Sequence, residues 1–244
     1  MSKGFCHLHC HSEYSSLDGG SRVDRMPEKL KELGMTAMAL TDHGVMQGLP
    51  DFQKHLKDND IKPILGLEAY LTPDRFDRSR GTTTWHITLL AETTEGYHNL
   101  CKISSRAFID GTIKTFGRPR ARADWKLLEE YSEGIICLTG CMAGPVMRAI
   151  MQDGSITEAR AYTERLVEIF GKDNVYGELQ NVGITVGVPG DSEVAKLLGK
   201  DPLTEAEAAG MEGYHGDVVE EVEAGEVPIS QTEANRILVE SCQK

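Results

Sequence analysis

Apolar runs of strand length, alternating with stretches of helical periodicity, are the feature that most limits the fold of this chain. Between these runs, apolar residues recur every three or four positions, as they do on one face of a helix. This alternation is typical of βα units around a parallel sheet or barrel, so we predict an α/β fold. The predicted strands are residues 5–11, 36–41, 62–71, 84–92, 134–140 and 175–180, and the predicted helices are residues 22–34, 96–108, 123–131 and 155–171.

A different composition begins after Gln180. Residues 187–228 carry eleven acidic side chains and only two lysines. Helical periodicity returns in residues 229–244. We therefore expect residues 184–228 to form a solvated acidic insertion or linker, followed by a final helix at 229–244.

The overall composition argues against several classes of protein. The net charge of −12 does not suit a globally basic nucleic-acid binder. No apolar run approaches the ~20 residues that span a bilayer, and the first residues lack the pattern of a secretory signal, so we expect a cytoplasmic protein without a membrane partner. The six cysteines are scattered through apolar segments, which favours buried or metal-ligating thiols over a disulfide framework.

Three of the eight histidines, His7, His9 and His11, occupy alternate positions of the first predicted strand. Alternate side chains of a strand point to the same face, so these imidazoles are predicted to lie side by side. The carboxyl ends of strands meet where α/β folds place their active sites. Residues with metal-binding chemistry recur there, namely Asp42 and His43 after the second predicted strand, Glu68 in the third, His86 in the fourth and Cys141 after the fifth.

These side chains together indicate a metal site. Imidazole, carboxylate and thiolate bind Zn²⁺, Mn²⁺ or Fe²⁺, and a set too large for one ion indicates a multinuclear site, which activates water and holds a phosphate. Glu68 is a strong indication, because an unpaired carboxylate in an apolar strand is costly to bury without a cation. Taken singly, each residue also fits a plainer role, since strand histidines are commonly hydrogen-bonded core residues and buried cysteines are commonly inert.

Four further residues have less specific roles. His7 is predicted to support the ligands from behind, and Asp42 either bridges metals or orients His43. His55 and His98 fall within helical stretches and are expected to be surface or packing residues.

Several blocks of the sequence resemble a known family. They are "FCHLHCHSEYSSLDG", "ALTDHG", "ILGLEAYL", "WHITLLAETTEGYHNLCKISSRAF", "GRPRARADWKLLEEYSEGIICLTGC" and "VYGELQ". In this order they are similar to the PHP (polymerase and histidinol phosphatase) domain, in the branch found at the N-terminus of bacterial DNA polymerase III alpha subunits. The resemblance implies a distorted seven-stranded β/α (TIM-like) barrel over residues 1–183, with a trinuclear metal site and, in some members, a proofreading 3′–5′ exonuclease.

The resemblance also implies roles for particular residues. It makes Glu68 the bridge between two ions and adds Asp18 of "SLDG" to the ligands. We expect Glu68, Asp42 and His43 to be the catalytic residues. Two to three divalent ions are implied, as Zn, Mn or Fe, or else Mg. The full implied ligand set is His9, His11, Asp18, His43, Glu68, His86 and Cys141.

One element of the family pattern is missing from the sequence. The family closes its site with an Asp-x-His on a last strand, and the sequence stops at Lys244, in a predicted helix that resembles the one before that strand. We therefore expect a barrel that lacks its last strand in this chain. His215 and Asp217 stand in the reverse order and are weak substitutes.

Three functions remain open from the sequence. The first is a metal-dependent exonuclease on the 3′ end of single-stranded DNA, with DNA replication as its setting. The second is a non-catalytic metal-binding module of a split or truncated polymerase. In that case the remaining polymerase polypeptide is its partner, and polymerase activity belongs to the assembled protein. The third is a small-molecule phosphatase of the histidinol-phosphatase type. For the DNA path, we predict phosphate contacts from the basic stretch that contains Lys114, Arg118, Arg120 and Arg122, although a solvated charged loop is almost as good an interpretation.

Overall fold

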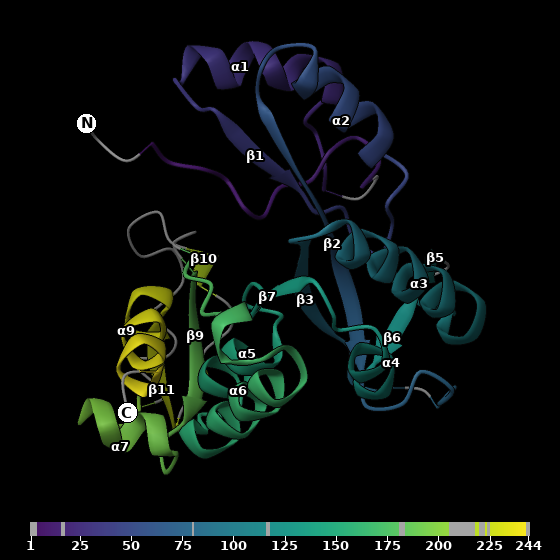
Figure 1. The fold of residues 1–244 in the computed structure, drawn as a ribbon. Helices are drawn as coiled ribbons and strands as arrows, with labels where there is room; N and C mark the ends of the chain where they lie inside the picture. Colours follow the sequence, from purple (N-terminus) through teal and green to yellow (C-terminus); the bar gives the residue numbers. More distant parts are fainter. Residues whose placement is uncertain are drawn as a thin grey trace. The chain divides into compact units, whose positions relative to one another are not determined.

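The computed structural model describes residues 4–15, 18–79, 81–115, 118–180, 184–204, 218–219, 223 and 225–242. It divides into two compact units, and each is described here by itself (Figure 1). The first unit comprises Met1–Leu138 and Ile169–Val175, and the second comprises Thr139–Glu168 and Tyr176–Lys244.

The main sheet contains β1 (Ala37–Leu40), β2 (Lys62–Thr72), β3 (Trp85–Ala91), β6 (Arg122–Asp124), β7 (Ile135–Leu138) and β8 (Val175–Tyr176). Its order is β1-β2-β3-β7-β8, with β6 also paired to β2. Strands β1 and β6 run parallel to β2. The predicted α/β class is therefore confirmed, and in the described part of the chain the strand path is open, without closure into a barrel.

Strand β3 departs from the parallel arrangement that the alternation suggested. It runs antiparallel to both β2 and β7. The reason is the connection from β2 to β3, where the described residues between 73 and 84 contain no helix. A parallel pair is usually joined by a helical crossover, whereas a return without a helix favours an antiparallel pair.

The predicted first strand, residues 5–11, does not form a regular strand. It runs beside β1, where the backbone N–H of Ala39 donates to the carbonyl of His7 and that of Thr41 donates to the carbonyl of Cys10, at 2.8 and 2.9 Å. The Thr41 hydroxyl also accepts from the Cys10 N–H. The histidine segment is therefore held in place by a neighbouring strand.

The helices of the first unit are η1 (Val23–Arg25), α1 (Met26–Glu32), α2 (Leu49–Lys57), α3 (Thr94–Gly111) and α4 (Trp125–Glu130). The side chain of Thr93 caps α3 and that of Asp124 caps α4 by accepting the N–H of a residue in the first turn. Helix α2, which contains His55 but is missing from the predicted helix ranges, buries Phe52 and Leu56 against the residues around β1. A hairpin of β4 (Ile113–Thr115) and β5 (Arg118–Arg120) follows α3.

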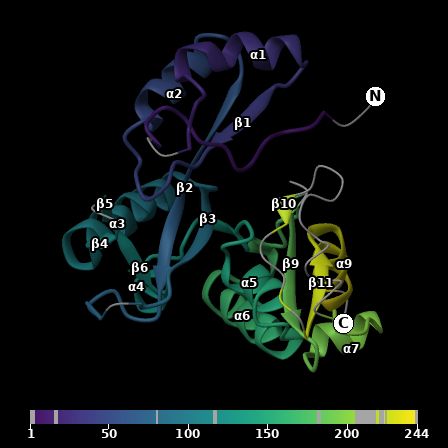
Figure 2. The ribbon, with the colours of Figure 1, turned by 180° about the vertical axis from the view of Figure 1, so that it is seen from behind.

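The second unit contains α5 (Pro145–Met151), most of α6 (Ile156–Phe170), β9 (Ile184–Pro189), α7 (Glu193–Leu198), β10 (Val218–Val219), β11 (Glu226–Ser230) and α9 (Gln231–Cys242). The short helix η2 (Lys172–Asn174) precedes β8. Strand β9 lies between β10, which is parallel to it, and β11, which is antiparallel. Figure 2 shows α9 beside this sheet.

The range 184–228 stays a predicted insertion or linker, and its described part is not all solvated loop. Where it is described, it supplies strands whose Val188 and Val227 face each other in register and are fully buried. The final helix begins at Gln231 rather than 229. His215 and Asp217 lie outside the described residues.

Two expectations from composition bear on the described residues. No helix among them is long and apolar enough to cross a membrane. Five of the six cysteines, Cys6, Cys10, Cys101, Cys137 and Cys141, are free thiols.

Candidate metal centre

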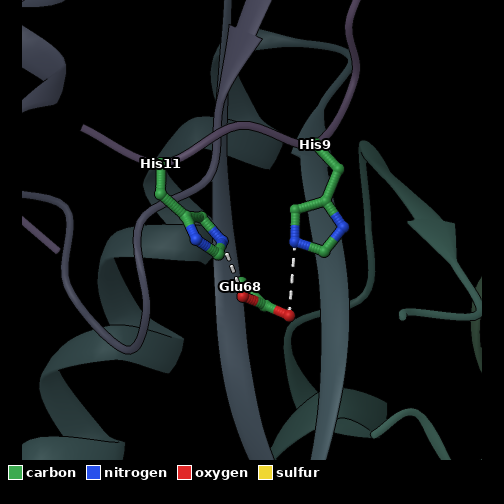
Figure 3. Close-up of side chains that lie close together, drawn as sticks. All are labelled: His9, His11 and Glu68. Carbon is green, nitrogen blue, oxygen red and sulfur yellow. Dashed lines mark ion pairs between the residues drawn. The ribbon is translucent and has the colours of Figure 1, made fainter. Parts of the chain in front are cut away.

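Glu68 lies in the middle of β2, and three segments bring histidines to it. His86 is on β3, where it pairs with Tyr70, two residues along β2 from Glu68. His43 follows β1, and the Glu68 carbonyl accepts the N–H of the next residue, Gly44, at 2.8 Å. His9 arrives on the extended segment beside β1 (Figure 3). Residues far apart in the sequence therefore converge in the first unit.

The Glu68 carboxylate has 1% of its side chain exposed, and two histidines approach each of its oxygens. Oε1 lies 3.2 Å from His9 Nε2 and 3.2 Å from His86 Nδ1. Oε2 lies 2.8 Å from His11 Nε2 and 2.7 Å from His43 Nδ1. We call these five residues, together with Asp18, the Glu68 cluster.

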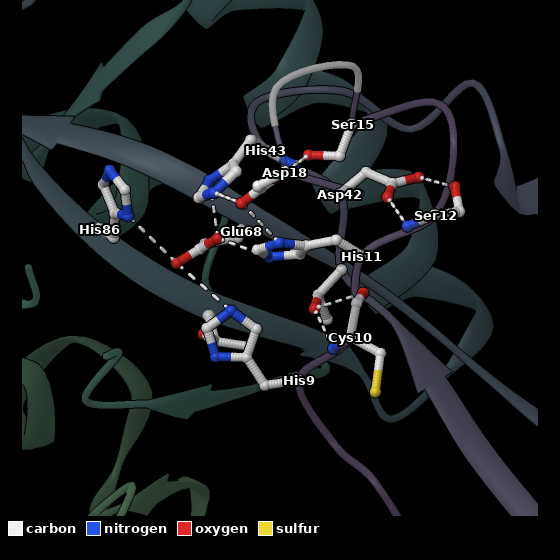
Figure 4. A network of polar contacts seen from close by, with 12 residues as sticks. His9, Cys10, His11, Ser12, Ser15, Asp18, Asp42, His43, Glu68 and His86 are labelled. Carbon is white, nitrogen blue, oxygen red and sulfur yellow. Dashed lines mark hydrogen bonds and ion pairs between the residues drawn. The ribbon is translucent and has the colours of Figure 1, made fainter. Parts of the chain in front are cut away.

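Asp18 contacts the far side of two of these rings (Figure 4). Its Oδ2 lies 2.9 Å from His11 Nδ1 and 2.8 Å from His43 Nε2, and its Oδ1 accepts the hydroxyl of Ser15. The side chain of Asp18 is 42% exposed. The cluster is therefore open to solvent at Asp18 and closed at Glu68.

The proton count of this arrangement favours a bound cation. A neutral imidazole has one N–H, yet His11 and His43 each lie between Asp18 and Glu68. If both rings are neutral, two ring lone pairs face carboxylate oxygens. His11 Nε2 and His43 Nδ1 are buried and make no aligned hydrogen bond with any described residue. The repulsion between these lone pairs and the carboxylate oxygens is removed when a proton or a metal ion lies between them.

The electrostatics of the cluster point the same way. Burial alone would raise the pKa of the Glu68 carboxyl, but the close approach of the imidazoles of His11, His43, His86 and His9 lowers it far below its ordinary value. Burial would lower the pKa of His43, but the hydrogen bond and charge of Glu68, with those of Asp18, raise it. Glu68 is therefore an anion at all ordinary pH values.

The donor set fits divalent metal ions. The ligand atoms fall into overlapping groups, each within 4.8 Å, and Glu68 belongs to two of the groups while His11 and His43 each belong to two. Nitrogen and carboxylate donors of this kind suit Zn²⁺, Mn²⁺ and Fe²⁺. Shared donors are what a site for more than one ion requires. The groups are His9, His11 and Glu68; His11, Asp18 and His43; and His43, Glu68 and His86.

Asp42 does not join the cluster. Both of its oxygens are bound by Ser12, whose backbone N–H donates at 2.6 Å and whose hydroxyl donates at 2.8 Å. Figure 4 shows its carboxylate directed to Ser12 rather than to Glu68. Burial raises the pKa of Asp42 and outweighs these hydrogen bonds. These contacts favour a role for Asp42 in positioning the segment that carries His11, and its metal-bridging role stays a prediction.

The remaining predicted ligand and support residues lie elsewhere. Cys141 belongs to the second unit, and its role as a ligand stays a prediction. The ring of His7 packs edge-on against Phe5, with centroids 4.8 Å apart, and its predicted support of the ligands also stays a prediction. His98 is exposed on α3, as expected for a surface residue.

The predicted basic residues have different environments. Lys114 is exposed on β4. Arg118 is on β5, and its side chain lies outside what the structure describes. Arg122 is fully buried and donates to the carbonyls of Gly111 and Asp77, so it cannot reach a nucleic acid and its predicted phosphate contact is corrected.

Arg120 lies over the ring of Tyr70, with its guanidinium carbon 5.3 Å from the ring centroid. Tyr70 in turn stacks on His43, with centroids 5.7 Å apart and planes 10° apart. The sequence analysis overlooked Tyr70, together with Ser12 and Ser15. Tyr70 could have been found, because it stands two residues after Glu68 in a strand and so shares its face.

Comparison with known proteins follows these observations. The family model described as "PHP domain" matches residues 7–182. Three curated relatives are named DNA polymerase III subunit alpha. That of Treponema pallidum is 42% identical over 198 residues, that of Aquifex aeolicus 40% over 190, and that of Mycobacterium tuberculosis 38% over 221. The matches cover 80%, 74% and 82% of this chain and 16%, 16% and 18% of the relatives.

Likeness to solved structures is weak. An amidohydrolase from Chromobacterium violaceum matches with a TM-score of 0.39 and 14% identity, covering 92% of this chain and 90% of its own. A protein described as a metal-dependent phosphoesterase from Bifidobacterium adolescentis matches with a TM-score of 0.31 and 16% identity, covering 42% and 32%. The chain spans about a sixth of the length of the curated relatives.

Proposed function

Since this chain belongs to the PHP domain family, we propose that it is a metal-dependent phosphoesterase that removes nucleotides from the 3′ end of single-stranded DNA. The observation that carries the proposal is the buried Glu68 carboxylate with two histidines at each oxygen. This donor set suits a multinuclear site, and such sites hydrolyse phosphate esters.

Each residue of the Glu68 cluster has a distinct part in the proposed site. Glu68 is the shared ligand, because its two oxygens face separate pairs of histidines. His11 and His43 connect it to Asp18. When bound, two to three divalent ions, as Zn, Mn or Fe, or else Mg, supply Lewis-acid stabilisation of the phosphate oxygens and activate water.

The shape of the Glu68 cluster sets the direction of substrate approach. Glu68 is almost inaccessible, whereas Asp18 is 42% exposed. The phosphate is therefore expected to approach from the side of Asp18. Cys141 stays a proposed ligand on the resemblance alone.

The choice of DNA as substrate rests on the names of the relatives. The curated relatives carry the name DNA polymerase III subunit alpha, whose substrate is DNA. A role in replication, beside the rest of such a polymerase as partner, follows from this proposal. Removal of 3′ nucleotides would then serve proofreading.

A second candidate is a non-catalytic metal-binding module. The histidine side chains at Glu68 are only 11–20% exposed. Closed sites with saturated ligands are typical of structural metals, and open positions of catalytic ones. The exposure of Asp18 favours the catalytic candidate, and the following experiment separates the two.

The test measures digestion of a 5′-labelled single-stranded oligonucleotide by the chain with added Mn²⁺ or Zn²⁺. We expect stepwise shortening from the 3′ end, its loss when His9 and His11 are both replaced by Ala, and its retention in His98→Ala, a matched surface histidine. A chain that binds metal but cuts neither DNA nor p-nitrophenyl phosphate supports the structural module. Hydrolysis of p-nitrophenyl phosphate alone supports a small-molecule phosphatase.

A further inference from the structure

The ring of Tyr70 connects the Glu68 cluster to the β4–β5 hairpin. Tyr70 is buried on β2, stacks on His43 and meets His86 edge-on, with centroids 5.7 and 5.1 Å away. The guanidinium of Arg120, at the end of β5, lies 5.3 Å from the centre of the same ring. Arg120 is therefore held one aromatic ring away from two of the cluster histidines.

The guanidinium donors of Arg120 are unused among the residues that the structure describes. Among the residues that the structure describes, Arg120 makes its contact with the face of Tyr70 and no hydrogen bond or ion pair. Its neighbour two positions on, Arg122, is buried and donates to backbone carbonyls. Arg75 is likewise committed to Asp124, with Nη1 2.7 Å from Oδ1. Arg120 thus differs from both in its half-exposed position and its unused N–H groups.

We propose that Arg120, held on the ring of Tyr70, binds a phosphate of single-stranded DNA next to the phosphate at the Glu68 cluster. The inference rests on the proposed function only for its choice of DNA as the ligand. A guanidinium offers a planar fork of N–H donors that matches a phosphate in a two-bond geometry. A strand with two or more phosphates engages the cluster and Arg120 together, whereas a phosphomonoester engages the cluster alone.

The stacking of Tyr70 argues for recognition of phosphate rather than of a base. Bases of single strands usually stack on exposed aromatic rings. Here the ring is already stacked on His43 and covered by Arg120, and the residue is only 6% exposed. Tyr70 is therefore a positioning residue, and the contact carries no sequence preference.

The test measures binding of a fluorescein-labelled oligothymidylate to the full chain by anisotropy, with chelator present, over a series of salt concentrations. The variants are Arg120→Gln, Arg120→Lys and, as matched control, the exposed Arg25→Gln on η1. Affinity for a single strand falls with salt, with a slope of about −0.7 per phosphate contact. We expect Arg120→Gln to bind more weakly and to lose about 0.7 from that slope.

The other variants sharpen the result. Arg120→Lys keeps the charge and is expected to keep the slope while binding more weakly, because the ammonium lacks the planar fork. Arg25→Gln is expected to match the wild type. Equal slopes and affinities for Arg120→Gln and Arg25→Gln would overturn the inference.

A hydrolysis assay with the same variants complements the binding measurements. With metal present, the ratio of p-nitrophenyl phosphate turnover to DNA digestion is expected to rise in Arg120→Gln, since a monoester has no neighbouring phosphate. An equal loss of monoester turnover would overturn the neighbouring-phosphate contact. Absence of DNA digestion by the wild type contradicts the proposed function alone, because the binding data decide the inference separately.

Discussion

Two buried polar clusters that border strand β2 solve the same electrostatic problem in different ways. One is the Glu68 cluster. The other, near the end of the strand, we call the arginine network, consisting of Arg75, Arg122 and Asp124. In the network the cations are permanent: Asp124 accepts from Arg75, and Arg122 donates to backbone carbonyls.

The Glu68 cluster has no such permanent cation. Its carboxylates face histidines, whose charge depends on protons or on a ligand. Arginine remains charged at any ordinary pH. The difference teaches that a carboxylate matched by arginine stabilises the fold, whereas one matched only by imidazoles marks a place for a metal ion.

Replacing Glu68 is expected to have the largest effect on function. Glu68→Gln removes the shared anionic ligand. Loss of a residue that only hydrogen-bonds to a metal ligand lowers activity by up to about 100-fold, so loss of the ligand itself should lower phosphoesterase activity by at least that factor. Initial rates on single-stranded DNA measure this. Glu92→Gln, an exposed carboxylate after β3, is the control. Activity equal to that of the control would contradict the assignment of Glu68.

Breaking the arginine network should instead cost stability. Asp124→Asn leaves Arg75 buried without its partner and weakens the cap of α4, so the free energy of unfolding should fall by about 3–5 kcal/mol. Urea denaturation followed by circular dichroism measures it. Activity per folded molecule should match the wild type. A loss of activity without a loss of stability would contradict the purely structural role of the arginine network.

Chelation should act on one cluster only. Ions that bind the folded chain stabilise it by about 2.7 kcal/mol at a concentration 100 times their Kd, so removing them should lower the Tm of the wild type. Asp124→Asn should show the same chelator-induced shift from a lower starting Tm. Glu68→Gln should show none, and a full shift in that variant would place the ions elsewhere.

Asp42 should give the smallest effect. Asp42→Asn weakens the two hydrogen bonds from Ser12 and should cost about 1–3 kcal/mol, the range for a disturbed buried hydrogen bond. Metal affinity should fall about tenfold, because the segment with His11 is less well held. Metal titration monitored by calorimetry tests this, and a loss as large as that of Glu68→Gln would make Asp42 a ligand.

The sequence predicted the components of the Glu68 cluster better than their surroundings. His9, His11, His43, Glu68 and His86 were all singled out, because imidazoles and a carboxylate in apolar strands are chemically conspicuous. The structure brings them together, although their role as ligands stays a prediction. The partner of Asp42 was missed, since nothing in the sequence shows which way a buried carboxylate turns.

Other features were hidden for physical reasons. A period of two shows which residues share a face but not the direction of a neighbouring strand, so the antiparallel β3 was not foreseen. The same period cannot show which arginine of the basic stretch is buried, which is why Arg122 was wrongly assigned to DNA. The acidity of residues 187–228 masked the buried Val188 and Val227.

The metal content of protein purified without chelator tests the central claim most directly. Inductively coupled plasma mass spectrometry should find two to three equivalents of Zn, Mn or Fe in the wild type and in Asp124→Asn, and a clear loss in Glu68→Gln. A folded wild-type chain without metal, or equal metal content in Glu68→Gln, would contradict the account of the Glu68 cluster as a metal centre.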